Sequence, residues 1–192
     1  MAGRQLKLTA EMSAALEHGV DISGRRIFLH GDVDADSIAM AIRGMYLMAD
    51  QSESPIELYV ASYGGDIDEA FALHDVTRTI SVPVHTIALG MCMSAAPFLV
   101  ACGHKGNRFA SENCEFMLHT ASMEVEGTMS NVAGTADAVR RRCERMDRLL
   151  AKYTNKPYRH WSRFSRASDD YYFTAQQALE WGLIDHIWSE KS

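Results

Sequence analysis

The sequence contains little cysteine and little proline, and each shortage narrows what the chain can be. Four cysteines occur in 192 residues and none forms a C-x-x-C pair, so neither a disulfide framework nor a zinc site is predicted. The thiols expected to be reduced and mostly buried are those of Cys92, Cys102, Cys114 and Cys143. Only four prolines are present, and no Pro/Gly-rich linker, repeat or low-complexity tract divides the chain. Residues 1–192 are therefore expected to form a single domain, without a metal or other cofactor.

Excess basic charge and a targeting segment are also lacking. Nineteen Lys+Arg against 25 Asp+Glu give a net charge of −6, which argues against a nucleic-acid partner. The segment Met1–Lys7 is too polar for a secretory signal. The apolar run Val84–Gly103 approaches the length of a membrane span, but Gly90 and Pro97 interrupt it, so a buried strand followed by a buried helix is predicted. A soluble, cytoplasmic protein without membrane contact is expected.

Strands and helices alternate along the chain. Apolar runs predict strands, and apolar residues at helical spacing predict helices. The predicted strands are Arg26–His30, Ile56–Val60, Val82–Leu89, Phe116–His119 and Leu183–Ile187. The predicted helices are Thr9–His18, Asp36–Asp50, Asp66–Ile80, Ser94–Cys102, Thr128–Tyr153 and one that begins at the capping box Thr174–Gln177 and ends at Gly182. This alternation indicates β-α-β units, a largely parallel sheet and an α/β fold.

The helix predicted after Thr128 carries an apolar stripe at heptad-like spacing. Its members are Val132, Ala136, Val139, Cys143, Met146, Leu150 and Tyr153, and the charged residues Arg140, Arg141, Glu144, Arg145, Asp147 and Arg148 are assigned to the opposite face. A narrow apolar seam of this kind packs either on its own domain or on another subunit, and the spacing leaves both open.

Four polar features follow predicted strands. Asp32, Asp34 and Asp36 resemble the start of a calcium loop, but the later EF-hand positions lack the required glycine and glutamate, so these aspartates are interpreted as turn and helix-cap residues. Gly64-Gly65 either forms a turn or lets the backbone approach a ligand.

Ser94 follows the strand that ends near Gly90, and is either a helix cap or a nucleophile near a helix start. His119 ends an apolar strand, and Asp169-Asp170 precede another apolar segment. Each feature alone is more often structural. Together, in the order Gly-Gly, Ser, His, Asp, they offer a nucleophile, a base, an orienting acid and oxyanion donors.

At these residues the chain resembles the proteolytic subunit of the Clp protease, from about Arg26 to the C-terminus. The matching stretches begin at Arg26 (RIFLHG), Ile56 (IELYVASYGG), Gly90 (GMCMS), Gly103 (GHKGNRFA), Phe116 (FMLH) and Phe173 (FTAQQALEWGLID). The resemblance implies Ser94 as nucleophile, His119 as general base, Asp170 as orienting acid (with Asp169 its less favoured neighbour), and the N–H groups of Gly65 and Ala95 as oxyanion donors.

The resemblance also implies a crotonase-like β-α-β superhelical core with a protruding helical handle at 124–160, after an N-terminal segment at 1–20. It implies a serine endopeptidase that hydrolyses unfolded proteins inside a homo-oligomer of two stacked heptameric rings, fed by an ATP-dependent AAA+ unfoldase. The chain departs from the family pattern around the site, with Tyr63 before Gly-Gly, Ala95-Ala96-Pro97 after the serine and Thr120-Ala121 after the histidine. Two alternatives therefore stay open: a catalytically silent ring subunit that regulates active paralogues, and a capsid-maturation or bacteriophage-borne protease of the same fold.

Overall fold

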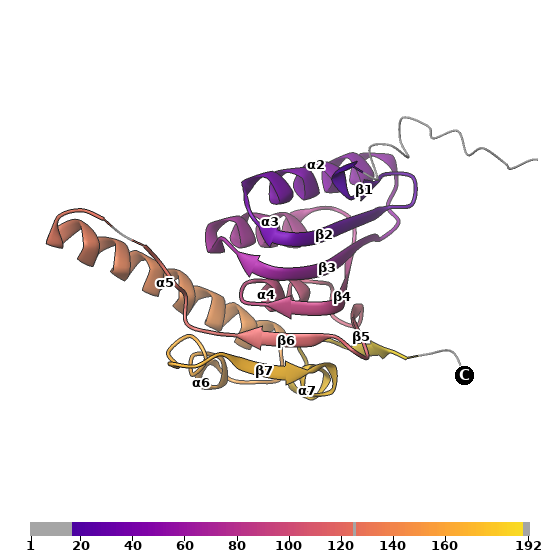
Figure 1. Cartoon of the computed structure of the whole chain (residues 1–192). Helices are drawn as coiled ribbons and strands as arrows, with labels where there is room; N and C mark the ends of the chain where they lie inside the picture. Colours follow the sequence, from indigo (N-terminus) through magenta and orange to yellow (C-terminus); the bar gives the residue numbers. More distant parts are fainter. Residues whose placement is uncertain (1–16, 125, 190–192) are drawn as a thin grey trace, which may run out of the picture.

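The structure is a computed structural model that describes residues 17–124 and 126–189. In that part of the chain eight strands and six helices alternate (Figure 1). The strands are β1 (Val20–Asp21), β2 (Arg26–Val33), β3 (Ile56–Gly65), β4 (Val84–Met93), β5 (Arg108–Ser111), β6 (Glu115–Leu118), β7 (Tyr171–Thr174) and β8 (His186–Trp188). The helices are α2 (Ala35–Gln51), α3 (Ile67–Thr79), α4 (Ala96–Ala101), α5 (Met129–Tyr153), α6 (Tyr158–Trp161) and α7 (Ala175–Trp181).

The predicted α/β fold with a largely parallel sheet is confirmed. The sheet order is β1-β2-β3-β4-β5-β8, and the links from β2 to β5 and on to β8 are parallel. Strand β4 also pairs in parallel with β6 beyond the end of β5, and β6 pairs antiparallel with β7. One edge of β4 therefore pairs first with β5 and then with β6. The pairing with β6 lies at the end of β4 that leads into α4.

Most predicted elements are found with shifted ends. The helix expected at Thr9–His18 lies outside the described residues except for its last two positions. Strands β3 and β4 run several residues further than predicted, so Gly64-Gly65 are the last residues of a strand and not a turn. The strand expected at Leu183–Ile187 begins only at His186, because the N–H of Leu183 still donates to the Ala178 carbonyl of α7. Asp34 forms a capping box at the start of α2, as its interpretation as a cap residue predicted.

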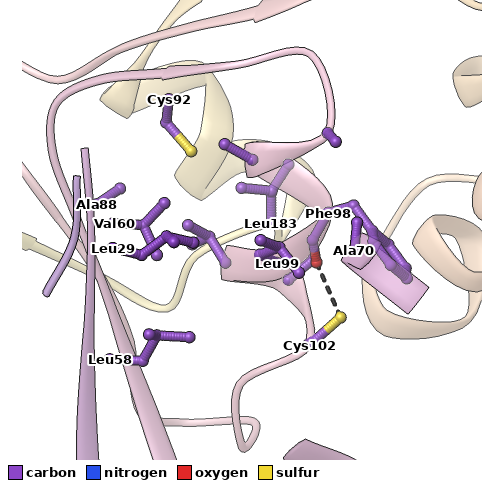
Figure 2. Close-up of a cluster of buried hydrophobic side chains, with 14 of the residues drawn as sticks. Leu29, Leu58, Val60, Ala70, Ala88, Cys92, Phe98, Leu99, Cys102 and Leu183 are labelled. Atoms are coloured by element: carbon purple, nitrogen blue, oxygen red, sulfur yellow. Dashed lines mark hydrogen bonds between the residues drawn. The ribbon is translucent and has the colours of Figure 1, made fainter. Parts of the chain in front are cut away.

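The core forms where the helices meet the sheet. Helix α2 packs on β1 and β2, α4 packs on β3 and β4, and α3 lies between these two helices. Every residue of α4 is buried. Figure 2 shows Phe98 beside Ala70 of α3, on the side away from the β3 side chains, and its ring packs on Phe71 and His74 of α3. The Cys102 thiol donates to the Phe98 carbonyl at 2.9 Å. The run of near-membrane length is thus β4 followed by α4, and no helix among the described residues has the length and apolarity to cross a membrane.

The apolar stripe of α5 divides into two parts. Met146 and Leu150 are buried against the same chain, and the Tyr153 hydroxyl lies 2.8 Å from Nε2 of His74. In the first half of the helix Ala136 is exposed and Val139 only half-buried, and this half projects beyond the sheet (Figure 1). The C-terminal half therefore packs on its own domain, and the N-terminal half of the stripe is left without a partner in the described chain.

Candidate active site

Ser94 lies in a strained connection between β4 and α4. Its φ is 58°, and among the described residues only Arg25 shares this left-handed conformation without being glycine. Such a conformation costs about 1–3 kcal/mol and persists where the surrounding structure enforces it. The N–H of Ser94 donates to the Met117 carbonyl at 2.8 Å, which extends the pairing of β4 with β6 and fixes the turn.

The interpretation of Ser94 as a helix cap is wrong. The N-cap of α4 is Ala95, which has no side chain able to cap, and the helix instead has proline in its first turn. The Ser94 hydroxyl lies 2.8 Å from Nε2 of His119. Its hydroxyl is therefore directed at a histidine rather than at the helix N-terminus.

The end of β3 needs glycines because its backbone passes close to the turn that carries Ser94 and to the end of β2. A Cβ on Gly64 would lie 2.5 Å from Cβ of Ser94 and 2.6 Å from the Met93 carbonyl oxygen, and the φ of Gly64 is +92°. A Cβ on Gly65 would lie 2.3 Å from the Val33 carbonyl oxygen of β2. Buried Ser62 accepts the N–H of Gly64 at 3.0 Å. The end of β3 thus passes directly beneath Ser94 only because these positions carry no side chain.

Sheet register brings the next two residues to Ser94. Met93 of β4 pairs with Met117 of β6, so Ser94 and His119 both lie just beyond the last paired residues at the same end of the sheet. Leu118 pairs with Tyr171 of antiparallel β7, so Asp170 lies on the next rung, opposite His119. Three neighbouring strands therefore deliver one side chain each.

The acidic partner of His119 is at ion-pair distance. Oδ1 of Asp170 lies 3.6 Å from Nδ1 of His119, longer than a hydrogen bond, and about half of the Asp170 side chain is exposed. Among the described ion pairs, Asp169 has none with His119. The hydroxyl of Thr120 donates to the Ala167 carbonyl and ties the exit of β6 to the loop before Asp170. The structure therefore brings together Ser94, His119 and Asp170, with the carboxylate not yet in hydrogen-bond contact.

The two expected oxyanion donors lie beside Ser94. Gly65 lines one cavity together with Ser94 and His119, and Ala95 lines a second cavity with the same two residues. The Ala95 nitrogen is within 2.8 Å of the position that a Gly64 Cβ would take, so Ala95 and the end of β3 are in close contact. This arrangement can hold an acyl group on Ser94 with backbone N–H groups nearby.

The second cavity, next to Ser94, has a volume of about 50 Å³. Its walls are mostly apolar, and the polar residues Asp147 and Ser165 also line it. The apolar side chains are Ile67, Leu118, Met146, Leu150, Trp161 and Phe164. Trp161 and Phe164 follow α5 in sequence, belong to the same buried cluster as Met146 and Leu150, and form part of the cavity wall.

Asp147 was predicted to lie on the charged face of α5, and its burial was not expected. Asp147 is only 5% exposed, and its carboxylate accepts the Ser165 hydroxyl at 2.7 Å. Burial raises the pKa of Asp147 to about 6, against the opposing effects of the Ser165 hydrogen bond and the Arg166 charge. The signal was present, because Asp147 lies four residues after Cys143 and three before Leu150, at the border of the apolar stripe.

Comparison with known protein families gives a match to a family of peptidases. A family model described as Clp protease matches residues 17–191, which includes every element described above. The match agrees with the resemblance drawn from the sequence motifs.

Proposed function

The chain belongs to the Clp protease family of serine peptidases, and on that premise we propose that it cleaves unfolded polypeptides through an acyl-enzyme on Ser94. The observation that carries this proposal is the 2.8 Å contact between the Ser94 hydroxyl and Nε2 of His119, made from a strained turn. A serine hydroxyl becomes an effective nucleophile when a base within hydrogen-bond reach takes its proton. This contact also speaks against a silent ring subunit.

In the proposed reaction, Oγ of Ser94 attacks the peptide carbonyl carbon while Nε2 of His119 takes its proton. Asp170 holds the imidazole ring and stabilises the imidazolium that forms. The N–H groups of Gly65 and Ala95 stabilise the oxyanion of the tetrahedral intermediate. His119 then gives the proton to the leaving amine as the C–N bond breaks, and water hydrolyses the acyl-enzyme by the same steps in reverse order. The 3.6 Å gap between His119 and Asp170 must close for this mechanism to operate.

Two neighbouring aspartates give a matched test of the acid. The Asp170→Asn variant should lower kcat on an unstructured peptide by about 10³–10⁴-fold, since the wrong imidazole tautomer is then favoured. The Asp169→Asn variant removes the same charge one residue away and should retain activity. Equal losses in the two variants, or an unaffected Asp170→Asn variant, would contradict the proposed role. Peptidase activity of the purified chain alone would also eliminate the silent-subunit alternative.

We further propose that the chain assembles into two stacked heptameric rings in the cytoplasm, with an AAA+ unfoldase delivering substrates. The half of α5 that projects from the sheet supports this, because its apolar residues Ala136 and Val139 are not fully buried by the described chain (Figure 1). Contact between the projecting halves of opposed subunits would bury them and enclose the active sites in a chamber.

A substitution in each half of α5 tests this assembly. Val139→Asp places a charge in the proposed interface and should lower the mass measured by light scattering while the circular dichroism of the subunit is unchanged. Met146→Asp is the contrasting variant, because Met146 is 9% exposed within its own chain, and this change should unfold the subunit. A Val139→Asp protein of unchanged mass would refute the proposed contact.

A further inference from the structure

The cavity beside Ser94 combines apolar walls with one buried acid. The cavity is lined by Ser94, Ala95 and His119 on one side and by the α5 residues Met146, Asp147 and Leu150 on another. A volume of about 50 Å³ admits several atoms of a side chain, since a single water needs roughly 10–15 Å³ measured in this way. A side chain next to the bond attacked by Ser94 can enter this space.

Asp147 is buried without a cationic partner. One of its oxygens accepts the Ser165 hydroxyl, and this is the only hydrogen bond that its side chain makes within the described residues. Among the described residues no Lys, Arg or His side-chain nitrogen lies within 4.0 Å of its carboxylate oxygens, although the more distant charge of Arg166 acts on it. The nearby arginines of α5 and the following loop are paired elsewhere, Arg142 with Asp68, and both Arg148 and Arg166 with Glu144.

A lone buried carboxylate is costly to a fold, and proteins that need only packing place an apolar or neutral residue there. Other buried charges in this chain are compensated: Arg108 is 2% exposed and makes a two-bond ion pair with Asp185. Asp147 differs because it has no paired cation but lines a cavity that could hold one. The same cavity is lined by the nucleophile Ser94.

We propose that Asp147 determines cleavage specificity by selecting a cationic side chain, lysine or arginine, in the residue whose carbonyl Ser94 attacks. This inference rests on the proposed peptidase function and adds a substrate class to it. The aliphatic part of such a side chain lies along Leu118, Met146 and Leu150, and its charged end reaches the carboxylate. A carboxylate at the floor of the primary pocket is how other serine peptidases select lysine and arginine.

An apolar side chain would be less favourable in this cavity than a cationic one, although the walls are mostly apolar. It would cover the ionised carboxylate and remove its remaining solvent without supplying a partner. An acidic side chain would add repulsion. The pocket therefore discriminates by the charge at its floor, with the apolar walls contributing to all substrates alike.

The test compares fluorogenic peptides that differ only in lysine, arginine, leucine or glutamate before the cleaved bond. For the full-length protein, kcat/KM should be at least roughly tenfold higher for lysine or arginine than for leucine. The isosteric variant Asp147→Asn should lose that preference, with kcat/KM for lysine and arginine falling to the value for leucine. The control Asp50→Asn removes an exposed acid from α2 and should keep the preference. Leucine preferred by wild type, or a preference that Asp147→Asn leaves unchanged, would overturn the inference.

A second measurement needs no variant. In wild type, the ratio of kcat/KM for lysine over leucine should rise as pH increases from 5 to 8, as Asp147 ionises. Cys143 and Glu144 on α5, Arg166 after α6 and His119 at the cavity mouth face the same region. Since His119 acts on both substrates, its contribution cancels in the ratio. A flat ratio would count against Asp147.

The failure of this inference can be distinguished from the failure of the proposed function. Each protein is treated with a fluorophosphonate, and the modified serine is identified by mass spectrometry. If Ser94 is labelled but the protein does not prefer lysine or arginine, the proposed role of Asp147 is refuted and the peptidase proposal stands. Absence of labelling at Ser94 in the intact assembly defeats the peptidase proposal itself.

Discussion

Asp147 should make the protein less stable at neutral pH than its uncharged counterpart. Burial raises the pKa of Asp147 from 3.8 to about 6, so the folded state holds this proton more tightly than the unfolded chain does. Stability therefore falls as pH rises between these two values, and the full penalty applies above about 6. The difference between these pKa values corresponds to a penalty of about 3 kcal/mol, and solvent in the open cavity screens the charge and reduces this to about 2 kcal/mol.

The Asp147→Asn variant removes the charge and keeps an oxygen that can accept the Ser165 hydroxyl. Urea unfolding followed by circular dichroism should show the variant more stable than wild type by about 2 kcal/mol at pH 8, with the difference shrinking toward pH 4. The exposed control Asp50→Asn should differ from wild type by less than about 0.5 kcal/mol at every pH. A variant less stable than wild type at pH 8, or a difference that does not change with pH, would refute the reasoning.

Further predictions concern the backbone beneath Ser94 and the buried ion pair. Gly64→Ala should abolish peptide cleavage and lower the urea concentration at the unfolding midpoint, because its Cβ would lie 2.5 Å from that of Ser94. The control Gly134→Ala has open space around the new Cβ on α5 and should stabilise the protein by up to about 1 kcal/mol. A tolerated Gly64→Ala in the peptidase assay would contradict this account. Asp185→Asn should lower the free energy of unfolding in urea by about 3–5 kcal/mol, since it leaves the Arg108 guanidinium buried without its charged partner. A loss of less than about 1 kcal/mol would contradict the importance of that pairing.

The fold class could be predicted from the sequence because it depends on local signals, whereas the candidate site residues came from the order Gly-Gly, Ser, His, Asp and from the resemblance to the Clp protease. Alternating apolar strands and amphipathic helices are readable from single stretches of chain. Ser94 and His119 each follow a strand of a parallel sheet, and such strand ends meet at one edge. The capping box at Thr174 was also readable, since it depends on residues three apart, and Asp34 was predicted as a cap residue although its capping box with Ser37 was not.

The remaining features depend on contacts between distant segments. Strand β7 pairs with β6, which lies far earlier in the sequence, so the antiparallel rung that places Asp170 opposite His119 was not predictable from local patterns. The burial of Asp147 depends on Trp161 and Phe164 packing back against α5, which widens the apolar side of that helix. The division of the α5 stripe has the same origin, because only its C-terminal half meets the rest of the chain.

The central claim is that Ser94 is the nucleophile, activated by His119. Covalent labelling with a fluorophosphonate, read by peptide mass spectrometry on the intact assembly, tests it most directly. We expect modification at Ser94 in wild type and its loss in the His119→Ala variant with the fold retained. No label at Ser94 in the intact assembly, or labelling that persists at the wild-type rate without His119, would contradict the account.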